Sequence, residues 1–466
     1  MLYDLTTITQ YFDVPIERKE LYGEVVTDFK LIEEMFSLIP ESFFSNPTLT
    51  WLDVGAGSGY FTIVLFNKLF YGLENIISNS EKRIKHILTK MITLVEINNH
   101  HTELLKSLFG KNAQIEIRDF LSYEPCKKYD IIYGNPPYTC LGSIKTPTNK
   151  NKNKKQDGKT VWPEFIKHSL HILKEGGFLL FIVPSLWMRP DKAHMHELLL
   201  KYKIHKCKCL TNTETNKWFK KKAQTPTCFF LLEKTIPYHF QNNSNNNNSN
   251  TISLYDSCYK TYKSYNYLLR EPLPLLGCSI ISKLREFVEK VGHIKIEKTN
   301  LPPKAAKLSL HQSNDFFYEN IRTCILGGSQ RLQAQLVIQY SNIPLKYNNQ
   351  KKLVLAHKMY GFPYYDKEGK YGISNRDNYI ILNKTNSEFL LLQQFLSSEL
   401  VLYVFETTRY RMSYLEKEAF MFLPDICKLE QFPATITNET LFSYFGINEV
   451  ERNHIENFSS KKYLSF

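Results

Sequence analysis

The chain has 466 residues and a mass of 54.7 kDa, a length that usually accommodates two or three domains. Hydrophobic residues make up 43% and charged residues 23% of the sequence, which excludes a wholly disordered chain. The 59 Lys and Arg exceed the 46 Asp and Glu by 13 charges, and this balance predicts a polyanionic partner, either nucleic acid or an anionic membrane surface.

Short apolar runs alternate with helical periodicity through the first half of the chain. Strands are predicted at residues 49–54, 92–97, 114–117, 129–133 and 178–183. Helices are predicted between them at residues 62–70, 81–90, 101–109 and 164–173. Most of the strands are too continuously apolar for a half-exposed sheet. The alternation therefore predicts an α/β domain with a mostly parallel sheet over residues 1–240.

Two polar segments mark the organisation of the chain. Residues 241–250, QNNSNNNNSN, contain no apolar side chain and predict a linker. A basic insert at 145–160 interrupts the first domain, with six lysines and one aspartate between Lys145 and Lys159. Beyond residue 250 the alternation weakens, and we expect a second domain over residues 251–466 with a helical stretch at 387–406.

No apolar run approaches the roughly 20 residues of a membrane-spanning helix, and the first twenty residues lack the features of a secretory signal. The nine cysteines show no disulfide framework. Cys207 and Cys209 form a lone C-x-C, too few ligands for a structural zinc site, so buried thiols or thiols without a role are expected. These features predict a soluble intracellular protein without membrane or metal, in the cytoplasm or, for a viral protein, at the host-cell replication site.

Acidic side chains end three successive strands. In LDVGAGSGYF, Asp53 is followed by Gly55 and Gly57 on a turn into a helix, a position where open α/β sheets bind ligands. The spacing matches neither the pyrophosphate fingerprint nor the phosphate loop, and a plain tight turn is the alternative. Glu96 follows, where a carboxylate can accept from ribose hydroxyls, and Asp119-Phe120 suits an adenine ring. Together they predict a nucleoside pocket without a phosphate.

The strongest signal is YDIIYGNPPYT, in which a buried strand leads into Asn135-Pro136-Pro137-Tyr138. The two prolines fix the backbone and remove two amide donors, so the Asn135 side-chain oxygen and the nearby carbonyls can act as free acceptors. Converging acceptors can hold an exocyclic amine and direct its lone pair at an electrophilic methyl group. Tyr138 can stack on a base. The alternative is a rigid turn at a strand end.

Through these motifs, residues 20–235 resemble an S-adenosylmethionine-dependent DNA adenine-N6 methyltransferase of the gamma-type Asn-Pro-Pro-Tyr family, like bacterial type II modification enzymes. The resemblance implies a Rossmann-like domain with a seven-stranded, mostly parallel sheet, followed by a mixed α/β target-recognition domain. It assigns S-adenosylmethionine and no metal. The residues implied at the cofactor are Gly23, Thr27, Asp53, Gly55, Gly57, Glu96, Asp119 and Phe120. Members of the family often carry proline where this chain has Asp28.

The same resemblance assigns the handling of a flipped-out adenine to Asn135, Pro136, Pro137 and Tyr138. Phe219 would cover the far face of that base, with Trp218 as the second choice. Double-stranded DNA is the implied partner of a monomer, and a partner restriction endonuclease is left open. The candidate DNA contacts are Lys145, Lys150, Lys152, Lys154, Lys155, Lys220, Arg376 and Arg409. Solvated faces and surface ion pairs are the alternative roles of these cations.

Three other functions are compatible with the motifs. Asn-Pro-Pro-Tyr also resembles RNA adenine-N6 methyltransferases and enzymes that methylate a glutamine of translation factors. The basic insert and the 216 residues after the linker favour DNA over both. A catalytically inactive nucleic-acid-binding protein is the third function, and the intact set of Asp53, Glu96, Asp119 and Asn135 argues against it.

Overall fold

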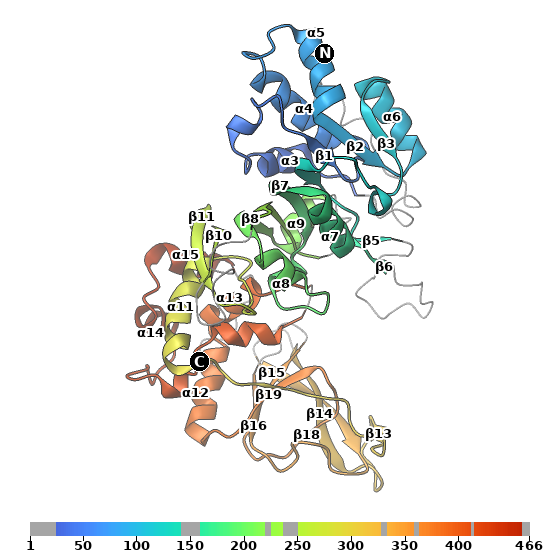
Figure 1. Cartoon of the computed structure of the whole chain (residues 1–466). Helices are drawn as coiled ribbons and strands as arrows, with labels where there is room; N and C mark the ends of the chain where they lie inside the picture. Colours follow the sequence, from blue (N-terminus) through green and yellow to red (C-terminus); the bar gives the residue numbers. More distant parts are fainter. Residues whose placement is uncertain are drawn as a thin grey trace. The chain divides into compact units, whose positions relative to one another are not determined.

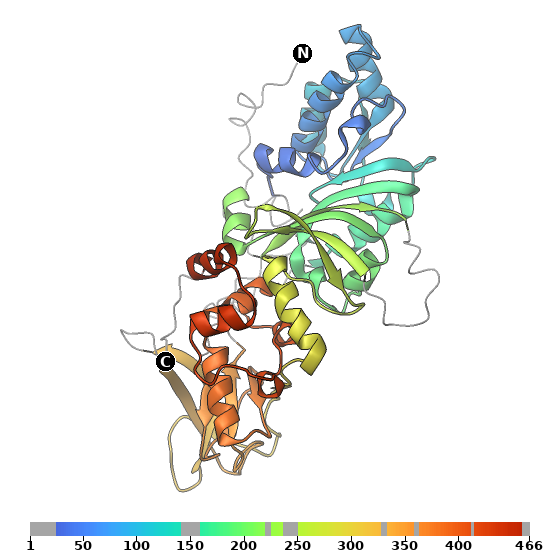
Figure 2. The same cartoon turned by 90° about the vertical axis from the view of Figure 1, so that its left-hand side faces the viewer.

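The computed structural model describes residues 25–140, 159–219, 225–235, 250–327, 333–357, 363–411 and 414–458. The chain divides into two compact units, one of residues 1–254 and 266–270 and the other of residues 255–265 and 271–466. In Figures 1 and 2 the first unit runs from blue to green and the second from yellow to red. The predicted linker at 241–250 lies outside the described residues except for Asn250, which begins a strand.

A nine-stranded sheet has the strand order β11-β10-β8-β9-β7-β4-β1-β2-β3, and its strands belong to the first unit except for the end of β10 and most of β11, which belong to the second. Neighbours from β7 through β3 are parallel, and β9 is antiparallel to both β7 and β8. The strands are β1 Trp51–Asp53, β2 Ile92–Glu96, β3 Gln114–Ile117, β4 Tyr129–Gly134, β7 Leu173–Pro184, β8 Lys203–Leu210, β9 Thr227–Glu233, β10 Asn250–Asp256 and β11 Thr261–Tyr267. Seven of them form the predicted Rossmann-like, mostly parallel sheet, which is confirmed, and the β10–β11 hairpin was not predicted.

Helices follow most strands of this unit, as the alternating pattern predicts. They are α3 Phe29–Phe36, α4 Tyr60–Gly72, α5 Ser80–His86, α6 Asn99–Phe109, α7 Trp162–Ile172, α8 Met195–Leu200 and α9 Asn212–Trp218. The predicted helix at 81–90 is α5 continued by a π-helical turn, Ile87–Met91. A two-stranded ribbon, β5 Thr139–Cys140 with β6 Lys159–Thr160, closes the base of the basic insert.

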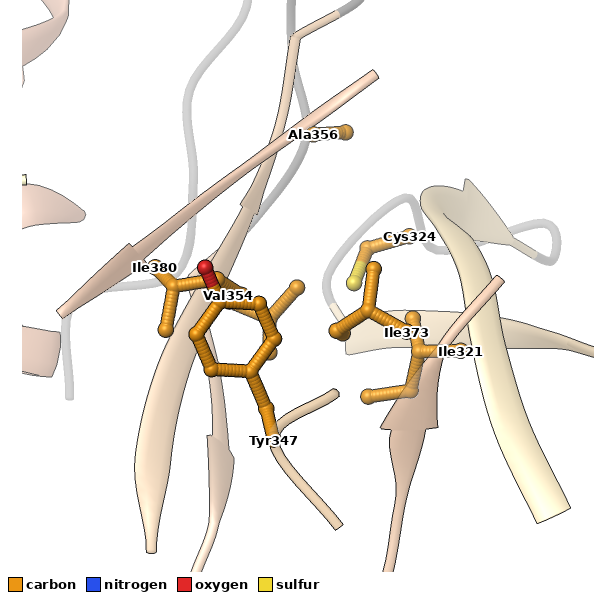
Figure 3. Close-up of a cluster of buried hydrophobic side chains, with 7 residues drawn as sticks. All are labelled: Ile321, Cys324, Tyr347, Val354, Ala356, Ile373 and Ile380. Carbon is orange, nitrogen blue, oxygen red and sulfur yellow. The ribbon is translucent and has the colours of Figure 1, made fainter. Parts of the chain in front are cut away.

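The second unit contains two four-stranded sheets, β12-β19-β16-β17 and β13-β15-β14-β18. Their strands are β12 Glu297–Lys298, β13 Leu308–Ser309, β14 Tyr318–Gly327, β15 Gln333–Ser341, β16 Lys352–Ala356, β17 Tyr364–Asp366, β18 Gly372–Ile373 and β19 Asn378–Ile381. Figure 3 shows the side chains that join the sheets: Ile321, Cys324 and Ile373 come from one, and Val354, Ala356 and Ile380 from the other, beside Tyr347. The sequence did not indicate these strands individually.

The α-helices of the second unit within the described residues are α11 Cys278–Val291, α12 Asn386–Leu396, α13 Glu399–Thr407, α14 Asn438–Tyr444 and α15 Glu449–Phe458. The helical stretch predicted at 387–406 is two helices, because Ser398 accepts a hydrogen bond from the Val401 amide and starts α13 anew. Within the described residues no single helix is long and apolar enough to cross a membrane; only α12 and α13 counted together reach that length, across a 64° bend.

Candidate functional site

The predicted site residues follow adjacent strands of the first sheet. Strands β4, β1, β2 and β3 are neighbours and parallel, so their carboxyl ends form one edge. Asp53 is the last residue of β1 and Glu96 the last of β2, while Asn135 follows β4 and Asp119 follows β3. This edge therefore brings together residues that are up to 82 positions apart in the sequence.

The glycine turn is joined to the next strand by Glu96. One carboxylate oxygen of Glu96 accepts from the Gly57 amide at 2.7 Å, and the other accepts from the Asn98 amide at 2.7 Å. Gly57 has a φ of +51°, a conformation that favours glycine. A Cβ added to Gly55 would meet no atom within 4 Å, so the turn leaves open space on that side. The sequence predicted Glu96 as a ribose acceptor, but not that it also holds the turn.

Asp53 is almost completely enclosed, with 1% of its surface exposed. The Thr62 hydroxyl donates to its Oδ2 at 2.9 Å, and the same hydroxyl lies 3.2 Å from the Tyr133 hydroxyl. Burial raises the pKa of Asp53 from 3.8 to about 7; hydrogen bonds from Thr62 and the Gly55 amide oppose the rise, and the charge of Glu96 adds to it. The carboxyl group of Asp53 therefore keeps its proton up to a higher pH than an exposed aspartic acid does.

A glycine-specific conformation carries the chain from β4 into the Asn-Pro-Pro-Tyr turn. Gly134 has a φ of +145°, and a Cβ at this position would lie 3.4 Å from Asp53 Oδ1. Asn135 follows directly, and its Nδ2 donates to the Thr27 hydroxyl at 3.0 Å. The Asn135 Oδ1 is buried and has no hydrogen-bond partner among the described residues. The turn therefore holds a buried acceptor at the strand edge, and the role predicted for Asn135 with a substrate amine stays a prediction.

Tyr138 lies between the turn and the base of the insert. Its carbonyl accepts from the Val161 amide at 3.1 Å, next to the β5–β6 ribbon. The ring is half-buried, and no described residue forms a hydrogen bond with its buried hydroxyl. Burial raises the pKa of Tyr138 well above its ordinary value, and the nearby Cys228 adds to the rise. Cys228 itself accepts from the Trp187 indole nitrogen at 3.0 Å.

The structure gives Asp119 and Phe120 different environments. Asp119 is exposed, and its side chain accepts from the Leu121 amide at 3.0 Å. Phe120 is buried and stacks on Phe165 with ring centroids 5.1 Å apart, while His168 meets it edge-on. Phe120 thus has a packing role that the sequence did not reveal, and its contact with an adenine ring stays a prediction.

The two aromatic candidates for the far face of the base differ in exposure. Phe219 follows α9 as its C-cap and has 1% of its surface exposed, whereas Trp218, the last residue of the helix, is half-buried. A ring that is fully enclosed offers no open face to a base in this conformation. The role of Phe219 therefore stays a prediction, and Trp218 is the more accessible of the two.

Most predicted nucleic-acid contacts, and one cofactor contact, lie outside the described residues. These are Lys145, Lys150, Lys152, Lys154, Lys155, Lys220 and Gly23. The Arg376 side chain is 68% exposed, and its Nε lies 4.0 Å from Oδ1 of Asp377. Arg409 donates to Glu406 at 2.9 Å and is only 23% exposed, so that part of its charge is already paired within the second unit. The predicted burial of Cys207 and Cys209 is confirmed.

Comparison with known proteins agrees with this geometry. Residues 51–219 match the Eco57I restriction-modification methylase family. This methylase segment contains the glycine turn, the three acidic strand ends and the Asn-Pro-Pro-Tyr turn, and it confirms the resemblance predicted from them.

Two individual relatives each match only part of this chain. The type II methyltransferase M.TthHB8I of Thermus thermophilus is 32% identical over 108 residues, which covers 21% of this chain and 24% of that protein. The release factor glutamine methyltransferase of Fusobacterium nucleatum is 31% identical over 183 residues, 37% of this chain and 46% of that protein. The chain thus spans less than half the length of either relative.

The solved structure of the type I restriction enzyme EcoKI M protein is 17% identical, with a TM-score of 0.37 over 51% of this chain and 49% of that chain.

Proposed function

We propose that this protein is a site-specific DNA methyltransferase that transfers the methyl group of S-adenosylmethionine to the N6 amine of a flipped-out adenine. The observation that carries the proposal is the buried Oδ1 of Asn135 in the Asn-Pro-Pro-Tyr turn, which has no partner within the part of the chain that the structure describes. A buried acceptor without a partner costs free energy, so its retention at the strand edge is best explained by a donor that arrives with the substrate. An exocyclic amine is such a donor.

The residues at the strand edge fit a nucleoside cofactor. Gly55 opens onto free space, while Glu96 and Asp119 present carboxylates at the ends of neighbouring strands. A carboxylate oxygen accepts more than one hydrogen bond, so Glu96 can hold Gly57 and still accept from a ribose hydroxyl. When bound there, S-adenosylmethionine supplies a methyl group that is already electrophilic. Thr27, Asp53, Gly55, Gly57, Glu96, Asp119 and Phe120, with Gly23, are the residues proposed to hold it.

The turn residues would orient the target amine. Asn135 Oδ1 accepts one N6 hydrogen, and the Pro136 carbonyl is proposed to accept the other, so that the nitrogen lone pair points at the methyl group. Both acceptors stabilise the positive charge that develops on the nitrogen during transfer. Pro137 keeps the turn rigid. No side chain has to form a covalent intermediate, because orientation and charge stabilisation suffice.

An adenine inside a duplex cannot reach these acceptors, so the base has to leave the stack. Tyr138 is proposed to stack on one face of the extruded base, and Phe219, or Trp218 as the more exposed ring, on the other. Each stacking face contributes about 1–3 kcal/mol. This contribution offsets part of the cost of extrusion.

Charge supports DNA as the substrate. Strand β5 follows Tyr138 directly and pairs with β6, which contains Lys159, the last lysine of the basic insert, so this end of the insert lies beside the proposed base site. We propose that these lysines contact phosphates beside the extruded nucleotide and that the second unit reads the target sequence, with Arg376 and Arg409 among its contacts. Residues 293–381 of that unit hold 13 Lys and Arg against six Asp and Glu. The resulting net charge of +7 is more than half of the +13 of the whole chain.

The second candidate is methylation of a glutamine side chain, which the match to the release factor enzyme favours. A glutamine amide presents a similar planar NH2 to Asn135. The deciding experiment incubates the purified protein with labelled S-adenosylmethionine and pools of duplex DNA, RNA and release-factor protein, followed by mapping of the product. N6-methyladenine at one DNA sequence is the expected product. Methylglutamine, methylcytosine or N6-methyladenine in RNA alone would contradict the proposal.

A further inference from the structure

Asn135 has little backbone freedom. Gly134 before it adopts a conformation with φ of +145°, and Pro136 after it restricts Asn135 to extended conformations. The terminal amide torsion of the side chain remains, and such torsions are broad and roughly two-fold. One orientation presents an oxygen to the target amine, and the other presents an NH2 group. Only the first orientation can accept, because two NH2 groups facing each other would leave both without partners.

Thr27 is the residue that contacts this amide. Its hydroxyl accepts from Asn135 Nδ2 at 3.0 Å, and the two residues are 108 positions apart in the sequence. Thr27 is 3% exposed. With Nδ2 bound to Thr27, the Oδ1 atom remains as the unpartnered acceptor.

The position of Thr27 is itself fixed by the helix that follows it. Asp28 caps α3 by accepting from the Lys30 amide at 2.9 Å. This explains why aspartate occupies a place where related enzymes often have proline. The Phe29 ring stacks on Tyr60 at 4.7 Å, which ties α3 to the first residue of α4 after the glycine turn. Glu34 of α3 forms an ion pair with Lys208 of β8. Thr27 therefore has a rigid support on its carboxyl side.

We infer that Thr27 is a positioning residue that holds the Asn135 amide with its oxygen toward the substrate amine. The inference rests on the proposed transfer of a methyl group to an amine at Asn135. It gives Thr27 a role in the chemical step, in addition to the cofactor contact that the resemblance implies. A serine can replace Thr27 because it keeps the hydroxyl, whereas valine keeps the shape and loses the acceptor.

The test compares single-turnover methylation rates at saturating S-adenosylmethionine for the full-length protein. Thr27→Val should slow methyl transfer by about tenfold, the effect of removing one orienting hydrogen bond. Thr27→Ser should retain the rate. Thr93→Val is the matched control: Thr93 is also buried, lies within β2 and is replaced in the same way, so it should leave the rate unchanged. Thr27→Ala serves if the valine variant does not fold.

A double-mutant cycle separates positioning from a merely structural role. If Thr27 acts through Asn135, Thr27→Val should have no further effect on the rate in the Asn135→Ala background. Independent, multiplicative effects would overturn the inference. So would a Thr27→Val variant that binds S-adenosylmethionine more weakly in calorimetry but transfers methyl at the normal rate when saturated, because Thr27 would then be a cofactor ligand alone.

Failure of the proposed function gives a different result. If the unsubstituted protein methylates glutamine, the substrate assignment is wrong, but the same cycle on that substrate still tests Thr27. If the unsubstituted protein transfers methyl to none of the pools, both the proposed function and the role of Thr27 are overturned.

Discussion

Replacing Asp53 by asparagine tests how the strand edge is charged. Asp53 is 1% exposed and accepts from the Thr62 hydroxyl at 2.9 Å. Burial raises its pKa from 3.8 to about 7 in spite of hydrogen bonds from Thr62 and Gly55, with a further rise from the charge of Glu96. In the unfolded chain the same carboxyl group should titrate near its ordinary value. The native carboxyl group therefore keeps its proton in a pH range where the unfolded one has lost it.

The sign and the size of the effect follow from proton linkage. Between about pH 4 and pH 7 the native state binds more protons at Asp53 than the unfolded state, so stability falls as the pH rises. The shift from 3.8 to about 7 corresponds to roughly 4 kcal/mol of unfolding free energy. Below this range both states are protonated, and above it both are ionised, so the contribution is constant there. Because asparagine does not titrate, the Asp53→Asn variant should lack this decline in unfolding free energy between about pH 4 and pH 7.

Tryptophan fluorescence in urea can measure this change. All four tryptophans, Trp51, Trp162, Trp187 and Trp218, lie in the first unit, so their emission reports the unfolding of that unit. The difference in unfolding free energy between the unsubstituted protein and Asp53→Asn should change by roughly 4 kcal/mol from pH 4 to pH 7, with the unsubstituted protein losing stability.

Asp130→Asn is the control for the Asp53 measurement. Burial of Asp130 acts to raise its pKa, but hydrogen bonds from Lys174 and Thr50 outweigh it and lower the pKa. The stability that Asp130 contributes is therefore lost only as the pH falls below about 4, and its difference curve should be flat from pH 5 to pH 7. An equally flat curve for Asp53 would show that its carboxyl group is ionised in the native state and would refute the reasoning.

Three further predictions concern catalysis and binding. Asn135→Ala should lower the single-turnover methylation rate by roughly 10² to 10³, because only one of two acceptors remains, and a near-normal rate would remove Asn135 from the chemistry. Tyr138→Ala should slow transfer on a matched duplex but much less on a mismatched target adenine, where extrusion costs less; an equal defect on both would contradict its stacking role. Replacing Lys150, Lys152, Lys154 and Lys155 by glutamine should flatten the salt dependence of DNA affinity at unchanged cofactor affinity. The log–log slope should fall by about 0.9 for each phosphate that a lysine no longer neutralises, and an unaltered slope would show that the insert is a solvated surface.

The sequence determined most of the strands and helices around the predicted site of the first unit. The run 178–183 is continuously apolar and lies between Gly177 and Pro184, and 114–117 alternates polar and apolar residues shortly before Asp119, so local patterns were sufficient to locate these strands. Asp53, Glu96 and Asn135 could be predicted at one edge, because parallel strands joined by helices bring their carboxyl ends together. In the second unit the short strands of two sheets carry no comparable local signal, and the stretch at 387–406 did not show its break at Ser398.

Only the tertiary structure decided how the site side chains are used. The hydrogen bond from Asn135 to Thr27 and that from Gly57 to Glu96 join residues 108 and 39 positions apart, and no periodicity or spacing encodes such pairs. Phe120 and Phe219 read as exposed aromatic partners in the sequence, yet both rings are buried. The same side chain can pack in a core or face a ligand, and which of these occurs depends on the elements that the completed fold places against it.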